Sequence, residues 1–215
     1  MKKFGAVFIL VLLTAVISAE AEASWTAEVF GGTAYNFNTP LTIHQTGEEN
    51  ISFNAKYDTK PLNGSPYYAF RFGRWKESRA WELEFIHHKL YLRNSPPEIQ
   101  LFEISHGYNF IYGNRAWKHK GFIFRVGAGL VMTHPETIVR GKELPWNRGL
   151  LRDGNYLSGV SAQVAAGKRF YLWKSLFFTL EAKLTASYAN IPIECGDANV
   201  PNVALHGLFG FGYDF

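Results

Sequence analysis

The segment 201–215 reads PNVALHGLFGFGYDF, and its apolar residues recur at every second position. Side chains alternate between the two faces of a β-strand, so a strand here has one apolar face and one small or polar face. The apolar face carries Val203, Leu205, Phe209, Phe211, Tyr213 and Phe215, and Leu208 is the exception on the other face. An aromatic face of this kind is typical of strands in outer-membrane barrels, whose aromatic residues lie at the membrane boundaries. A sandwich strand packed on a soluble core is the alternative.

The N-terminal segment has the pattern of a secretory signal peptide. Lys2 and Lys3 precede a short apolar run, residues 4–17, which leads to small residues ending at Ala23. A basic start, a short apolar core and an A-x-A exit predict cleavage, most simply after Ala23, with Ala21 as the next candidate. We therefore expect a signal peptide at 1–23 and one exported domain at 24–215.

Composition limits how such a chain can cross a membrane. Apart from the signal, no segment has the ~18 apolar residues that a spanning helix needs. Spanning strands must close on themselves to satisfy their backbone groups, and 16% aromatic residues with 20 Gly suit a barrel. The net charge of +4 is too mild to indicate a nucleic-acid partner. Cys195 is the one cysteine, so an internal disulfide is excluded.

Alternation recurs along the chain and predicts the strand count. The expected strands are residues 25–36, 67–75, 81–92, 101–112, 121–133, 156–170, 176–188 and 201–215. Short turns near 78, 117 and 173 alternate with longer loops at 37–66, 93–100, 134–155 and 190–200, and residues 51–57 could extend a strand beyond the membrane. This predicts an all-β fold, an eight-stranded antiparallel transmembrane barrel of the outer-membrane type. An even number of strands places both termini in the periplasm of a Gram-negative bacterium. The C-terminal Tyr213-Asp214-Phe215 resembles the signal read by the outer-membrane barrel-assembly machinery.

A barrel of this size has no water channel, because side chains fill it. The residues predicted to point inward are Glu28, Glu82, Glu84, Glu103, Glu181, Asp214, Arg71, Arg125, Arg169, Lys183, His88 and Asn109. We interpret the charged ones as a plug of ion pairs; a proton relay or a pore is the alternative. Tyr108, Phe110 and Tyr112 are predicted to face outward with the other aromatic residues.

Polar residues also fall on the outward face, where lipid is expected. His87 and Lys89 continue the outward parity of Trp81, His106 lies on the outward parity of the next segment, and His134 follows residues 121–133. Closing the loop near residues 93–99 places His87 opposite His106. Two structural explanations are possible: a bulge changes the register, or these residues contact lipopolysaccharide phosphates, with Lys89 extending to the membrane boundary. The functional alternative is a site that acts on the lipid itself.

A family resemblance bears on that choice. The strings Pro66-Tyr67-Tyr68, WxLEFxHxK at 81–89 followed by Tyr91, Phe102-Glu103 through Asn114, GAGL at 127–130, His134-Pro135 and Glu181-x-Lys183 together resemble the lipid A oxidase-like outer-membrane barrels. The resemblance implies oxygen-dependent oxidation of the proximal glucosamine of lipid A, with molecular oxygen and a divalent metal as possible cofactors. It carries His87, Lys89 and Glu84 over as catalytic candidates. The lipid A 3-O-deacylases use an outward His-x-Ser pair, and Ser105-His106 has the reverse order with opposite faces.

The sequence therefore predicts two alternative functions. One is an enzyme that modifies lipid A from the outer face of the barrel, with His106 added to the catalytic candidates and His87, His106 and His134 as possible metal ligands. The other is a non-catalytic barrel that binds lipopolysaccharide or supports membrane integrity. Both have lipid A or lipopolysaccharide as the partner.

Overall fold

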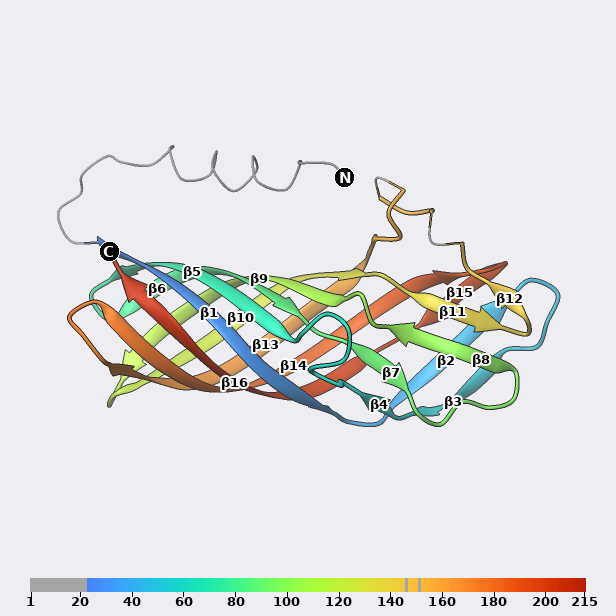
Figure 1. The fold of residues 1–215 in the computed structure, drawn as a ribbon, viewed down its shortest axis with the longest axis horizontal. Coiled ribbons are helices and arrows are strands. Elements are labelled where there is room, and N and C mark those ends of the chain that lie inside the picture. The colour runs from blue at the N-terminus through green and yellow to red at the C-terminus, as the bar shows by residue number, and fades with distance from the viewer. Residues whose placement is uncertain (1–22, 146, 151) are drawn as a thin grey trace.

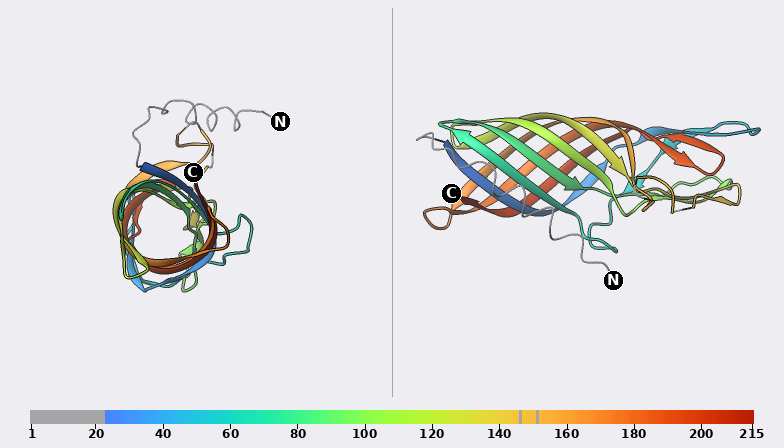
Figure 2. Two further views of the ribbon diagram at one scale, coloured as in Figure 1. Left: turned by 90° about the vertical axis from the view of Figure 1, so that its left-hand side faces the viewer. Right: turned by 90° about the horizontal axis from the view of Figure 1, so that it is seen from above.

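The computed structural model describes residues 23–145, 147–150 and 152–215, and in this part of the chain eight long strands form a closed antiparallel barrel (Figure 1). They are β1 (Ala23–Asn36), β5 (Tyr68–Lys76), β6 (Arg79–His87), β9 (Tyr108–His119), β10 (Phe122–Thr133), β13 (Tyr156–Tyr171), β14 (Leu176–Ile193) and β16 (Asn202–Asp214). The pairing order is β13-β10-β9-β6-β5-β1-β16-β14, and pairing of β13 with β14 closes the ring, which Figure 2 shows end-on. The predicted fold class is confirmed. The predicted signal peptide lies outside the described residues except for Ala23, which begins β1.

Shorter strands continue the barrel at the end away from Ala23 and Phe215 (Figure 1). On one side, β15 (Gly196–Asn199), β2 (Thr39–Gln45) and β3 (Ile51–Ala55) pair in sequence onto β14. On the other, β4 (Tyr57–Asp58), β7 (Leu90–Leu92), β8 (Ile99–Ile104), β11 (Glu136–Val139) and β12 (Lys142–Glu143) form a separate sheet. We call these strands the extension. The predicted long loops are thus largely hairpins, and residues 51–57 do extend the fold as β3 and the start of β4.

The extension folds because its inner side chains join one apolar core with those of the adjoining barrel lumen. Leu41 and Ile43 of β2, Phe102 and Ile104 of β8 and Ile191 of β14 are at most 2% exposed and belong to one buried cluster. Removing apolar surface from water is worth ~25 cal/mol per Å², which favours two packed sheets over free loops. The same alternation that forms the barrel wall therefore continues beyond it.

An apolar belt surrounds the barrel. Large apolar side chains on its outer face are exposed, among them Val29, Phe70, Phe72, Trp81, Leu83, Trp117, Val126, Leu180, Leu184, Phe209, Phe211 and Tyr213. Soluble proteins rarely expose a continuous apolar surface of this extent, so the belt is a lipid-facing surface. The described residues hold no helix that is long and apolar enough to cross a membrane.

The plug of ion pairs is confirmed, with one correction. The side chains of Glu28, Glu82, Glu84, Glu181, Arg71, Arg125, Arg169 and Lys183 are at most 3% exposed inside the barrel. Arg71 donates to Glu84 at 2.7 Å and to Glu181 at 2.6 Å. Arg125 bridges Glu82 and Glu181, each at 2.7 Å. Asp214 joins the edge of this group at 3.7 Å from Arg169.

Glu103 is not part of the plug, because the predicted faces of residues 101–112 were inverted. Tyr108, Phe110 and Tyr112 are fully buried in the lumen, where Tyr112 hydrogen-bonds Ser161 at 2.6 Å. Aromatic residues fill the lumen at the extension end, so in this segment an apolar side chain does not mark the lipid face. The strand β9 also runs further than predicted, and its turn lies at 120–121 rather than near 117.

Candidate functional site

Three neighbouring strands are interrupted at the same level, where the barrel meets the extension. The interruptions are residues 88–89 between β6 and β7, 105–107 between β8 and β9, and 134–135 between β10 and β11. Pro135 has no N–H to donate, and Gly107 has a φ of +138°, a conformation that L side chains rarely adopt. Backbone hydrogen bonds connect the interruptions, from Tyr108 to His88 at 2.7 Å and from His134 to Gly107 at 2.9 Å. We call these residues the strand-break line.

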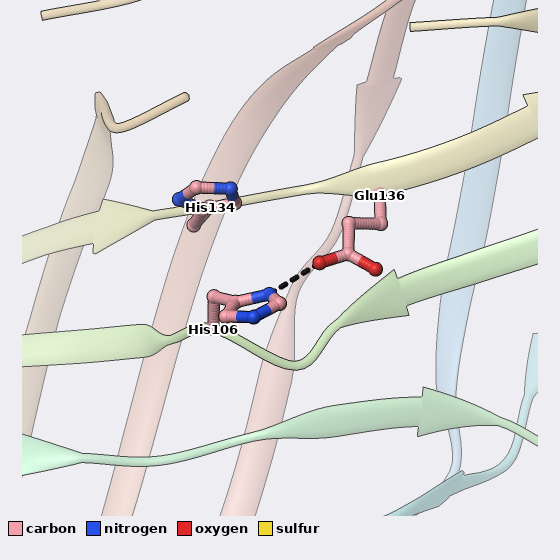
Figure 3. A group of neighbouring side chains, drawn as sticks. All are labelled: His106, His134 and Glu136. Carbon is pink, nitrogen blue, oxygen red and sulfur yellow. Dashed lines mark ion pairs between the residues drawn. The ribbon is translucent and has the colours of Figure 1, made fainter. Parts of the chain in front are cut away.

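The strand-break line brings two histidines and a glutamate together on the outer wall. His106 lies between β8 and β9, His134 lies between β10 and β11, and Glu136 begins β11 (Figure 3). The two imidazole centroids are 5.1 Å apart, and His106 Nδ1 is in ion-pair contact with Glu136 Oε1. One ligand atom from each residue lies within 4.8 Å of the other two. We call these three residues the rim cluster.

The rim cluster is accessible from outside the protein. The side chains of His106 and Glu136 are 60% and 33% exposed. Its height follows from the register: β9 and β10 pair up to Thr133, and the cluster begins one residue further on. The cluster therefore lies immediately beyond the β9–β10 ladder, past Leu130, the last large exposed apolar side chain of β10.

Other charged groups surround the rim cluster. Glu103 and Glu136 are opposite each other in the pairing of β8 with β11. Burial raises the pKa of the Glu103 carboxyl, with Glu136 adding to the rise and Lys60 and His106 opposing it. Burial and the neighbouring His106 lower the pKa of the His134 imidazole, against the attraction of Glu136. Acidic, basic and imidazole groups thus meet at one place on the wall.

His87 occupies a different place from the predicted one. It has the predicted outward parity, yet it is only 5% exposed, stacks on Tyr68 at 5.0 Å and hydrogen-bonds Asn109 at 2.8 Å. The pairing of β6 with β9 runs from Arg79 opposite Trp117 to Ile86 opposite Phe110. Continued by one residue, it places His87 opposite Asn109 and not opposite His106. The prediction that His87 lies opposite His106 is therefore wrong. The register changes at the interruptions 88–89 and 105–107, because β7 pairs with β8 as Leu90 with Ile104 while β6 pairs with β9 as Ile86 with Phe110. The alternation does not locate these interruptions.

Lys89 does not extend toward the boundary. Its side chain is fully buried, and its ammonium group donates to the backbone carbonyls of Asn63 and Ser65, each at 2.6 Å. The segment 59–66 therefore folds back over this part of the wall, where Lys60 also lies 4.4 Å from the Tyr91 ring. The prediction of a lipid-contacting Lys89 is wrong, because the cation is satisfied by the loop. In this structure Lys89 holds the loop to the barrel.

Glu84 is on the other side of the wall from the rim cluster. It lies in the lumen, as its parity predicts, and accepts from Lys183 at 2.6 Å and from Asn114 at 2.8 Å. His88, predicted inward, is also fully buried in the lumen.

A catalytic role for His87, Lys89, Glu84 and His106 stays a prediction, but these four residues do not form one constellation. The predicted metal candidates divide in the same way, since His106 and His134 meet and His87 does not join them.

Glu136 is the residue that the sequence reasoning missed. Residues two positions apart in an extended segment share a face, so His134-Pro135-Glu136 is a signal that could have revealed it. The sequence predicts a loop at 134–155, because Pro135 and the turn residues after it end the alternation. Its pairing with β8 became visible only in three dimensions.

Comparisons with known proteins found likenesses to solved structures at low sequence identity. No protein-family model matches the chain, and no curated protein matches it. Ail, the attachment invasion locus protein of Yersinia pestis, is similar at 12% identity with a TM-score of 0.43, over 90% of this chain and 99% of that one. AlkL, an outer-membrane protein, is similar at 12% identity and a TM-score of 0.47, over 94% of both chains. The outer-membrane protease OmpT of Escherichia coli is similar at 9% identity and a TM-score of 0.40, over 93% of this chain and 99% of that one.

Proposed function

We propose that this protein resides in the outer membrane of a Gram-negative bacterium and binds lipid A or lipopolysaccharide at the rim cluster. The observation that carries the proposal is the position of His106, His134 and Glu136, which open to the outside just beyond a lipid-facing belt. A head group lying at this height would be within reach of these polar groups. The exposed ammonium of Lys60, close to Glu103, adds a cation suited to a phosphate.

Oxidation of the proximal glucosamine of lipid A is a second candidate for the same site. It rests on the family resemblance and on a donor set, two imidazoles and one carboxylate, found in oxygen-using metal sites. The sugar would need a free C1 hydroxyl. Its oxidation removes two electrons and two protons, reduces molecular oxygen to hydrogen peroxide, and gives a lactone that takes up water to form the acid. Lipid A would gain one oxygen atom.

Mass spectrometry of lipid A tests catalysis. Cells with the protein are compared with cells that lack it and with cells that carry the double variant His106→Ala, Glu136→Gln. If the protein is this oxidase, lipid A should gain the mass of one oxygen atom in cells with the parent protein or the control variant. It should not do so in cells that lack the protein or carry the double variant. The control is His119→Ala, an exposed histidine at the far end of β9. An unchanged lipid A mass in all four strains would eliminate the oxidase and leave binding.

Binding is measured separately, as the association of the purified protein with vesicles of lipopolysaccharide and with vesicles of phosphatidylglycerol. We expect tighter association with lipopolysaccharide, weakened ~10-fold by the rim double variant, since a tenfold change corresponds to about one lost polar contact. The control variant should bind like the parent protein. Equal affinity for both vesicles, or no effect of the double variant, would refute lipid A recognition at this rim.

A further inference from the structure

The rim cluster has the composition of a metal site as well as of a lipid contact. It joins two imidazole nitrogens and one carboxylate oxygen, all within 4.8 Å of one another. Imidazole suits divalent zinc, iron, nickel and copper, and two histidines with one carboxylate are a recurring ligand set of zinc and non-haem iron. Three protein ligands leave coordination positions for water or for a substrate oxygen.

The backbone holds the three ligands in place before any metal arrives. His134 donates its N–H to Gly107 at 2.9 Å, which fixes it beside His106. Glu136 is fixed by the pairing of β11 with β8, opposite Glu103. Glu136 thus lies on a paired strand, and the two histidines lie in short strand interruptions that are tied together by a backbone hydrogen bond. Elements held in this way give more regular metal geometry than free loops do.

The neighbouring charges also favour a cation. Glu103 lies across from Glu136, so two carboxyl groups face one ammonium, that of Lys60, around the two imidazoles. His106 Nδ1 already contacts Glu136 Oε1, so a nitrogen ligand and a carboxylate oxygen face each other at this point. A divalent ion would take over that position and bring in His134 as well.

We propose that His106, His134 and Glu136 bind one divalent first-row transition-metal ion on the outer wall of the barrel. The inference deepens the function proposed above, because the ion would lie where the lipid head group is expected and could coordinate a phosphate or sugar oxygen. It is tested without lipid, so metal binding and lipid recognition can fail independently.

The experiment is a titration of the refolded protein, residues 24–215 in detergent, with Co²⁺ and with Zn²⁺. We expect one ion per chain by calorimetry, visible absorption bands from bound Co²⁺, and their loss when Zn²⁺ displaces it. His106→Ala, His134→Ala and Glu136→Gln should each weaken binding ~10- to 100-fold or more, since lesser outer-shell changes already do so. Glu136→Gln keeps the shape of the side chain, and unchanged migration of the unheated protein on gels confirms folding.

The matched control is His44→Ala, which removes an exposed histidine 3.4 Å from Asp197 in the extension. That pair has the same donor types as two of the three rim residues, and in the described structure it belongs to no group of three possible metal ligands. Full binding by His44→Ala, together with loss in the rim variants, supports the proposal. Absence of a stoichiometric site, or binding that survives replacement of all three rim residues, overturns it.

Discussion

The charged side chains of the plug and those of the rim cluster differ in both burial and pairing. Inside the barrel, Arg71 and Arg125 are fully buried and each contacts several carboxylates. On the outer wall, His106 is 60% exposed and its carboxylate contact in the described structure is Glu136. The fully buried part of the plug sets four acidic against four basic side chains, and Asp214 lies at its partly exposed edge beside Arg169.

This difference separates a structural cluster from a candidate functional one. A buried charge is tolerated only beside an opposite charge, and every charged side chain of the plug lies within 4.0 Å of one. The exposed rim cluster retains free coordination sites, which a ligand can use at little cost to folding. The same residue types therefore have different roles on the two sides of one barrel wall.

The largest expected effect follows from removing the centre of the plug. Arg71→Met removes the contacts of this guanidinium with Glu84 at 2.7 Å and Glu181 at 2.6 Å, and breaking a buried pair costs ~3–5 kcal/mol. Urea unfolding in lipid vesicles, followed by tryptophan fluorescence, measures this loss. The control is Arg93→Met, which breaks an exposed pair with Asp58 and should cost under ~1 kcal/mol. Equal stability of the two variants would refute a structural plug; if Arg71→Met fails to assemble, Arg71→Lys replaces it.

An intermediate effect is expected at Lys89, which is buried like the plug but lies on the outer wall. Lys89→Met removes two hydrogen bonds from a charged group, each worth ~1.5–3 kcal/mol, and should free the segment 59–66. Limited proteolysis with proteinase K should then cut within 59–66 several-fold faster. Lys56→Met, at an exposed position, is the control. A cleavage rate equal to that of the parent protein would show that Lys89 does not hold the loop.

The smallest effect on stability is expected at the rim cluster. Glu136→Gln breaks an exposed contact with His106, so the free energy of unfolding should fall by less than ~1 kcal/mol. The same unfolding assay measures it beside Arg71→Met. A loss as large as that of the plug variant would mean that the rim cluster is also structural, and the contrast between the two sides of the wall would disappear.

The sequence by itself determined the architecture and the interior charge. Alternation along residues 201–215 and 176–188 fixes which side chains face lipid, because a strand has a period of two. The polar residues between them then have to meet inside a closed barrel, which places Glu84, Arg71, Arg125 and Lys183 together without further information. These are local properties of each strand and need no knowledge of its neighbours.

Only the tertiary structure decided the candidate site. The meeting of His106, His134 and Glu136 depends on the register of β8 with β11 and of β9 with β10, which Gly107 and Pro135 adjust locally. Local alternation carries no information about the register between strands. The sequence therefore predicts, wrongly, that His87 lies beside His106, and it predicts a loop at Glu136. Lys89 was misplaced for the same reason: its partners are carbonyls of Asn63 and Ser65, far away in the chain. A period-two pattern sets the face of a residue, and pairing between strands sets its neighbours.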